Sequence, residues 1–132
     1  MQELAMKFED LAMTIPGAAT GIYIAHPTTE ILKPTYRGHK TQVNHLHTKI
    51  GITTKSFVKR ENEYMRTFQY EVAFYPILIA TPEVLAALET GVLQELLTCY
   101  SKSGSAKEWF FTTERQAIAE LVWKIADSSP TR

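Results

Sequence analysis

Four ionisable side chains in this sequence could act on a phosphate group: Tyr23, Lys49, Arg60 and Glu89. Arg60 lies three residues after Phe57 and four before Tyr64, in a pattern with helical spacing, so its guanidinium would lie beside an apolar stripe. A guanidinium placed there could bind a phosphate through two donors at once. The alternative is an arginine whose stem covers the edge of the core while its head lies in water.

Glu89 is the carboxylate that its helical pattern singles out. The apolar stripe of the same segment runs from Leu85 to Leu96, which places Glu89 on or beside the buried face. An unpaired buried carboxylate is costly, so it needs a partner or a metal ion. The alternative is a partly exposed acid that pairs with a lysine. Glu95 has a more exposed position and is the second choice for a metal ligand.

Tyr23 and Lys49 fall in two segments with the alternation of β-strands. If the two strands are neighbours and both side chains share one face, the ammonium would stabilise the phenolate and lower the pKa of Tyr23. The alternative is that each residue has a structural role in its strand.

The elements that must position these residues follow the order α-β-loop-β-α-β-α-(β)-α. We expect helices at residues 2–13, 55–67, 81–100 and 113–126, strands at residues 20–25, 47–53 and 69–80, and a short extended piece at residues 108–111. Ser56 or Thr54 could cap the second helix, Thr81 the third, and Gln116 suits a capping box in the last. This order predicts one α+β domain over residues 1–132, sandwich-like, with a small three-stranded antiparallel or mixed sheet flanked by helices. Residues 27–46, with their prolines and polar groups, indicate a long loop.

The net charge is zero, yet the positive charge is concentrated in the middle of the chain. Residues 33–67 hold eight lysines and arginines against two acids. Such a segment could face phosphates, or it could be a solvated surface. The residues we expect to contact a nucleic-acid backbone are Lys33, Arg37, His39, Lys40, His47, Lys55 and Lys59.

Composition limits the remaining classes of protein. A single cysteine, Cys99, excludes an internal disulfide and a cysteine-ligated zinc site. The first ten residues do not have the pattern of a signal peptide, and the longest apolar run, residues 72–80, is too short to span a bilayer. We therefore expect a cytoplasmic protein with no membrane partner.

The ordered set of motifs resembles the GIY-YIG nuclease superfamily, in particular a phage and bacterial branch of it. Gly21-Ile22-Tyr23 matches the first motif, and Lys49-Ile50-Gly51 matches the second with lysine in place of tyrosine. Arg60 stands nine residues after Gly51, where the family places its helical arginine.

Three later positions extend the resemblance over roughly residues 20–126. Tyr64 falls where the family has a histidine or a tyrosine, and Glu89 is similar to the metal-binding glutamate. Glu108-Trp109-Phe110 and the helix after it are similar to the end of the branch. The two motifs usually lie closer together than Tyr23 and Lys49, so residues 27–46 would be an insertion.

The resemblance implies a GIY-YIG-like fold and a metal-dependent DNA endonuclease. Arg60 would bind the scissile phosphate, and Tyr23, assisted by Lys49, would deprotonate the attacking water. Tyr64 would orient Tyr23 or the phosphate, and Glu89 would hold Mg²⁺ or Mn²⁺. The partner would be double-stranded DNA, and a homodimer is one way to add specificity. Two alternatives remain open: a non-catalytic nucleic-acid-binding module on the same fold, and a protein-interaction or regulatory domain.

Overall fold

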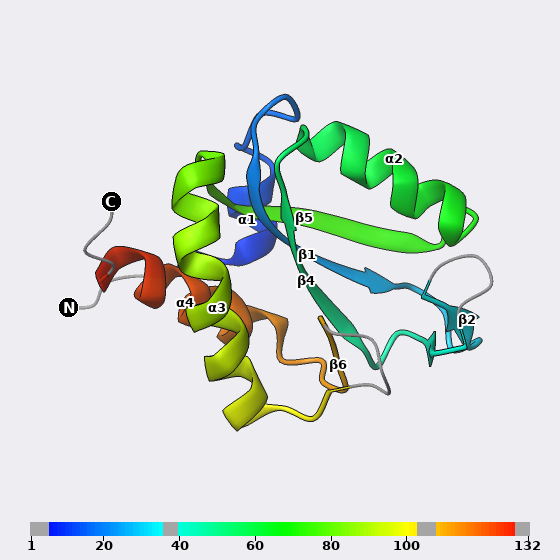
Figure 1. Cartoon of the computed structure of the whole chain (residues 1–132). Helices are drawn as coiled ribbons and strands as arrows, with labels where there is room; N and C mark the ends of the chain where they lie inside the picture. The colour runs from blue at the N-terminus through cyan, green and yellow to red at the C-terminus, as the bar shows by residue number, and fades with distance from the viewer. Residues whose placement is uncertain (1–5, 36–39, 103–107, 129–132) are drawn as a thin grey trace.

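The computed structural model describes residues 6–35, 40–102 and 108–128. Its elements are α1 (Phe8–Ala12), β1 (Gly21–Pro27), β2 (Lys33–Pro34), β3 (Gln42–Val43), β4 (Thr48–Thr53), α2 (Phe57–Thr67), β5 (Val72–Ile79), α3 (Pro82–Cys99), β6 (Trp109–Phe110) and α4 (Arg115–Ser128) (Figure 1). Within these ranges, no helix combines the length and the apolar character needed to cross a membrane.

The main sheet is antiparallel and has the strand order β5-β1-β4-β6, while β2 and β3 form a separate two-stranded sheet. The α+β class is confirmed, but the expected three-stranded sheet is wrong because β6 pairs with the start of β4. Trp109 and Phe110 are both buried, one on each side of the sheet, so pairing onto β4 removes two large apolar side chains from water.

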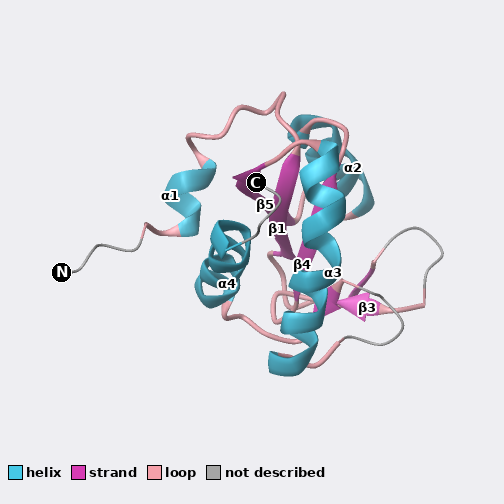
Figure 2. Ribbon diagram, turned by 60° about the vertical axis from the view of Figure 1, so that its left-hand side comes forward, coloured by secondary structure: helices cyan, strands magenta, loops and turns pink. Residues whose placement is uncertain are grey.

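The main sheet is covered on both faces, which explains why β1 is buried from Gly21 to Ala25. Ile22 and Ile24 pack into one apolar cluster with residues of α1, α3 and α4. Tyr23 and Ala25 point the other way, into a second cluster that includes Phe57 of α2. Figures 1 and 2 show α2 on one side of the strands and α3 on the other.

Several element boundaries differ from those expected. α1 has five residues rather than spanning residues 2–13, of which 2–5 lie outside the described ranges. β5 begins at Val72 because Gln69 and Tyr70 adopt left-handed backbone angles, with φ of 55° and 68°. The loop expected at residues 27–46 carries the paired strands β2 and β3.

The helix starts follow the sequence signals in two of three cases. The Ser56 hydroxyl accepts from the backbone N–H of Lys59, and the Thr81 hydroxyl accepts from that of Val84. The capping role expected for Gln116 is wrong, since α4 begins at Arg115. The Gln116 side chain instead accepts from the backbone N–H of Phe8 at 2.9 Å and so ties α1 to α4.

Glycine is required in both motifs because other groups approach its α-carbon too closely for a side chain. A Cβ on Gly21 would lie 1.8 Å from the carbonyl oxygen of Leu78 on the neighbouring strand. A Cβ on Gly51 would lie 2.0 Å from Cζ of Tyr23, whose ring crosses β4 at this position. The two glycines therefore have a structural explanation that is independent of any activity.

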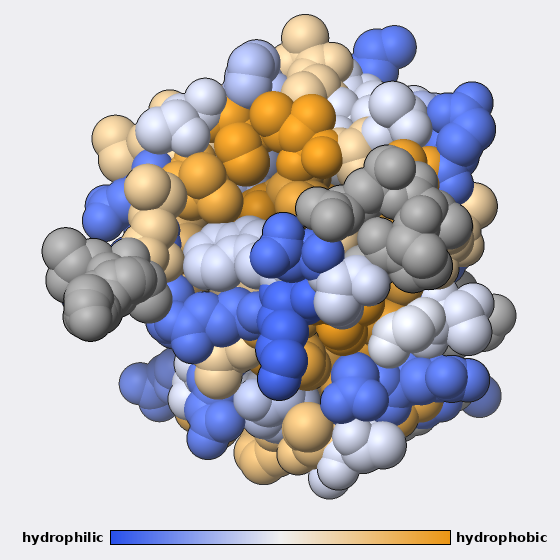
Figure 3. Space-filling view, turned by 90° about the vertical axis from the view of Figure 1, so that its left-hand side faces the viewer, coloured by the Kyte–Doolittle hydropathy of each residue, from blue (hydrophilic) through white to orange (hydrophobic). Residues whose placement is uncertain are grey.

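An apolar groove of about 460 Å³ lies between α1, the end of β5 and α4, and its lining includes Leu11, Ile15, Leu78 and Trp123. Figure 3 shows apolar side chains gathered above a polar band on the side of the molecule that carries α4. The indole N–H of Trp123 donates to the carbonyl of Ile77 at 2.6 Å, so α4 covers part of the outer edge of β5.

We predict that Gly51→Ala lowers the free energy of unfolding by about 1–3 kcal/mol or more, because the new methyl group overlaps the Tyr23 ring. Gly91→Ala is the matched control, since a Cβ there meets nothing within 4 Å in helix α3. It should stabilise the protein by roughly 0.5–1 kcal/mol. Urea unfolding of both variants measures the difference, and equal effects would contradict the close approach of Tyr23 to Gly51.

Candidate active site

Four of the five residues singled out for chemistry come from three elements and meet on the α2 side of the sheet. Tyr23 lies on β1, Lys49 on β4, and Arg60 and Tyr64 on α2. The register pairs Tyr23 with Gly51 and Ala25 with Lys49. Paired residues of antiparallel strands share a face, so Lys49 projects from the same face as Tyr23. The motif order in the sequence therefore corresponds to one surface in space.

Tyr23 and Tyr64 form a buried pair. Their hydroxyl oxygens lie 2.8 Å apart in a hydrogen bond, and the Tyr23 ring stacks on Phe74 with centroids 4.5 Å apart. Tyr23 is 2% exposed. Burial is the main cause that raises the pKa of both phenols above the ordinary value, since a phenolate would lose its hydration.

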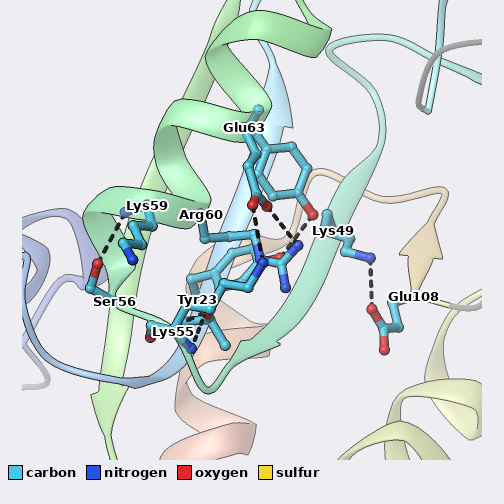
Figure 4. Close-up of polar contacts among 10 residues, drawn as sticks. Tyr23, Lys49, Lys55, Ser56, Lys59, Arg60, Glu63 and Glu108 are labelled. Carbon is cyan, nitrogen blue, oxygen red and sulfur yellow. Dashed lines mark hydrogen bonds and ion pairs between the residues drawn. The ribbon is translucent and has the colours of Figure 1, made fainter.

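The expectation that Lys49 lowers the pKa of Tyr23 is wrong. The Lys49 ammonium lies 2.6 Å from a carboxylate oxygen of Glu108, and in Figure 4 its side chain runs toward Glu108 rather than toward Arg60. The pKa of Tyr23 is raised, because desolvation outweighs the hydrogen bond from Tyr64 and the positive charge of Arg60. Tyr23 is a neutral hydrogen-bonding group in this arrangement.

Arg60 is partly committed to another side chain. Its Nη1 donates to Glu63 at 2.9 Å, and one third of its side chain is exposed. Its Nε–H is buried and has no hydrogen-bond partner in the part of the chain that the structure describes. A buried donor without a partner is costly, so this N–H suits an acceptor supplied by a ligand or water.

Glu89 lies on α3, in the layer on the opposite side of the sheet from α2. α3 packs with Ile22 and Ile24, on the other side of the sheet from Tyr23 and α2. The Glu89 side chain is half-buried and makes no hydrogen bond or ion pair with a described residue. Glu95 is exposed.

Among the carboxylates considered, Glu89 fits a divalent cation best. Glu63 and Glu108 are already neutralised by Arg60 and Lys49. No group of three or more metal-ligating side chains occurs among residues 6–35, 40–102 and 108–128. A magnesium ion commonly uses one or two carboxylates and fills its other positions with water and substrate phosphates, so Glu89 could serve as a single protein ligand.

The residues expected to contact a nucleic-acid backbone divide into three groups. Lys55 and Lys59 are exposed around the first turn of α2, near Arg60 (Figure 4), and Lys40 is also exposed. Lys33 forms an ion pair with Glu71. Arg37 and His39 lie outside the described residues.

His47 is wrong as a backbone-contacting residue because it is buried. Its ring packs edge-on against Phe111 and its Nδ1 lies 3.1 Å from both the side-chain oxygen and the backbone nitrogen of Asn44. Desolvation lowers its pKa, which keeps the ring neutral at physiological pH.

Three further residues shape the site although the sequence analysis gave none of them a role in it: Glu63, Glu108 and Arg115. Glu63 could have been found, since it lies three residues after Arg60 on one helix face. Glu108 contacts Lys49 across 59 sequence positions, and no local pattern indicates this. The Arg115 guanidinium donates to the backbone carbonyls of His45 and His47, which fixes the approach to β4.

Comparison of the chain with family models, curated proteins and solved structures finds no match.

We predict that Tyr23→Phe lowers stability at neutral pH and weakens its pH dependence above pH 10. The lost hydrogen bond should cost about 1 kcal/mol or more, because the Tyr64 hydroxyl stays buried. In the wild type, the raised phenol pKa contributes stability that is fully present below the unfolded-state value near 10 and decreases above it. At pH 11 the decrease attributable to this group is on the order of 1 kcal/mol, and the variant should lack it.

Urea unfolding at pH 8 and pH 11 measures both effects. Tyr70→Phe is the control, because Tyr70 is 78% exposed and its hydroxyl should contribute less than about 0.5 kcal/mol. A Tyr23→Phe variant with the wild-type slope between the two pH values would contradict the buried, neutral phenol.

Proposed function

We propose that this protein is a metal-dependent DNA endonuclease whose phosphate-binding face is formed by Tyr23, Lys49, Arg60 and Tyr64. The observation that carries the proposal is the convergence of these residues from β1, β4 and α2 on one face of the sheet. They were selected from the sequence by type and order, and their resemblance to the GIY-YIG nucleases supports the assignment of the reaction.

Arg60 is the residue proposed to bind the scissile phosphate. Its Nε–H, which has no partner in the described part of the chain, and its partly exposed guanidinium leave donors for phosphate oxygens. About one third of each side chain in the ion pair with Glu63 is exposed, so a phosphate can replace that carboxylate at modest cost. A guanidinium in this position would stabilise the charge that develops on the nonbridging oxygens during hydrolysis.

The tyrosine pair is proposed to act through neutral hydrogen bonds. In a pair of hydroxyls one donates to the other, and the acceptor keeps its own proton for a further bond. That second O–H could hold a phosphate oxygen or the attacking water. The raised pKa of Tyr23 argues against a role as the general base.

Glu89 and Arg60 belong to opposite layers, so a phosphodiester in contact with both must lie beyond an edge of the sheet. The outer edge of β4 suits it, because β6 pairs with Thr48 and Lys49 only, so that among the described residues positions 51–53 have a strand partner on the β1 side and none on the outer side. A divalent cation held by Glu89 would supply positive charge for the leaving oxygen.

Double-stranded DNA is the proposed substrate, held through its backbone. The exposed ammonium groups of Lys55 and Lys59 adjoin Arg60 at the start of α2 (Figure 4). Contacts of this kind release counterions, so binding should weaken steeply as the salt concentration rises.

The second candidate is a nucleic-acid-binding module without catalysis. One observation favours it: Tyr23 is buried and neutral, and both Lys49 and Arg60 are paired with carboxylates of the same chain. Such a module would keep the salt-sensitive binding and would not cleave.

We predict that the wild-type protein cleaves plasmid or branched DNA with Mg²⁺ or Mn²⁺ and not with EDTA. Arg60→Ala and Glu89→Ala should each reduce cleavage by at least about 100-fold, the order expected when a group that stabilises transition-state charge is removed. Arg66→Ala is the matched control for Arg60→Ala, because Arg66 is exposed on the same helix, and Glu95→Ala tests the second choice for the metal ligand.

The outcomes separate the two candidates. Cleavage that survives in Glu89→Ala but disappears in Glu95→Ala would move the metal ligand to Glu95. Salt-sensitive DNA binding without cleavage by the folded wild type would favour the binding module. Neither binding nor cleavage at low salt would contradict both.

A further inference from the structure

We propose that Glu108 is a positioning residue that holds the Lys49 ammonium in place for the phosphate. The inference rests on the proposed function of this face and adds a residue to which neither the sequence pattern nor the charge distribution assigned a role. Its basis is the ion pair of 2.6 Å between Lys49 Nζ and Glu108 Oε1, seen at the right of the cluster in Figure 4.

The main chain fixes Glu108 beside Lys49. β6 pairs with β4 so that Trp109 lies opposite Lys49, and the backbone N–H of Ile50 donates to the Glu108 carbonyl at 3.0 Å. The Trp109 side chain is 3% exposed and packs against Phe68 with centroids 6.0 Å apart. Glu108 therefore enters the site from an anchored strand, so its pairing with Lys49 does not depend on a chance rotamer at the surface.

The Lys49–Glu108 pair is more enclosed than the other ion pairs of the cluster. The two side chains are 15% and 24% exposed, whereas Lys55 and Glu63 are 59% and 36% exposed. Breaking a partly dehydrated pair leaves a poorly solvated charge, while an exposed pair separates at little cost. We infer that an arriving phosphate displaces Glu63 from Arg60 and Lys55 but leaves Glu108 on Lys49.

An ammonium can serve both groups at once. It carries three N–H donors, and the hydrogen bond to Glu108 uses one of them. The remaining donors can reach a phosphate oxygen while the carboxylate restricts the conformations of the flexible lysine side chain. Glu108 thus acts through Lys49 and does not itself touch the DNA.

This role predicts opposite effects on binding and on cleavage. Glu108→Gln keeps the shape of the side chain and removes one negative charge from a face that binds a polyanion. DNA affinity at low salt should therefore stay equal or increase. The cleavage rate of bound DNA should fall by about 10–100-fold, as is typical when a residue that orients a reactive group is lost.

The experiment compares wild type, Glu108→Gln, Lys49→Ala and the double variant, with Glu114→Gln as control. Glu114 is exposed and bonds to Tyr100 rather than to the cluster. Single-turnover cleavage and DNA affinity in EDTA are measured for each. If Glu108 acts through Lys49, the double variant cleaves no more slowly than Lys49→Ala. Additive losses in the double variant, or weaker DNA binding by Glu108→Gln, would overturn the proposal.

A second readout does not require nuclease activity. Reductive methylation of the intact protein, followed by peptide mass spectrometry, compares Lys49 with the exposed Lys55 and Lys59. In the wild type Lys49 should react several-fold more slowly than these two, and Glu108→Gln should remove most of that difference. Equal Lys49 reactivity in both proteins would overturn the proposal even if the enzyme cleaves DNA. If no DNA is cleaved by the wild type, the nuclease assignment fails and methylation still decides the role of Glu108.

Folding of the variants is checked by thermal unfolding. If Glu108→Gln does not fold, Glu108→Asp replaces it, because it keeps the charge and shortens the reach to Lys49 by one methylene. Methylation of Lys49 should then be faster than in the wild type, and an unchanged rate would contradict the positioning role of Glu108.

Discussion

The Tyr23 ring lies across Gly51 of the neighbouring strand, and the candidate site depends on this contact. The ring occupies the space that a side chain at position 51 would need, and the same ring is enclosed by Phe74 and Tyr64. The strand register then places Lys49 one step along the same face. Because α2 must cover the ring, its inward side carries Tyr64 and Arg60 to the same place. A single close approach between two strands thus sets the positions of all four residues.

The electrostatics of this face follow from how deeply each group is buried. The phenols are enclosed and stay neutral, since their ionised forms would be poorly solvated. The cations Lys49, Lys55 and Arg60 lie nearer the surface, and each forms an ion pair with Glu63 or Glu108. The arrangement offers a phosphate several hydrogen-bond donors in a chain whose net charge is zero. When DNA binds, one of its phosphates would take the place of a carboxylate of the same chain beside a cation. The total charge around that cation would then change little.

Local patterns in the sequence predicted the features that depend on residues close together in the chain, such as helix caps and apolar stripes. The caps Ser56 and Thr81 and the core stripe of α3 follow from spacing and side-chain type. The approach of Tyr64 to Tyr23 was expected only from the resemblance. The placement of Arg60 beside Tyr64 follows from helical spacing. The assignment of these residues to DNA hydrolysis comes from the resemblance and is a proposal.

Long-range contacts could not be read from the same patterns. The pairing of β6 with β4 joins segments about sixty residues apart, and the Lys49–Glu108 ion pair depends on it. The predicted direction of the Tyr23 pKa shift was wrong for the same reason. The burial of Tyr23 under α2 and the pairing of Lys49 with Glu108 both depend on tertiary contacts. His47 was predicted to contact a nucleic-acid backbone because it lies in a basic segment. The structure buries its ring through contacts with Asn44 and Phe111.

The most direct test of the central claim is an NMR titration of the Arg60 side chain with a short DNA duplex. The Nε–H of Arg60 is buried and has no hydrogen-bond partner among the described residues, so a phosphate at this site should change its resonance strongly and slow its exchange with water. The account predicts that the Arg60 signal responds together with the Lys49 ammonium, while that of the exposed Arg66 on the same helix changes little. Saturable DNA binding that leaves the Arg60 Nε–H signal unchanged would show that the phosphate lies elsewhere and would contradict the account.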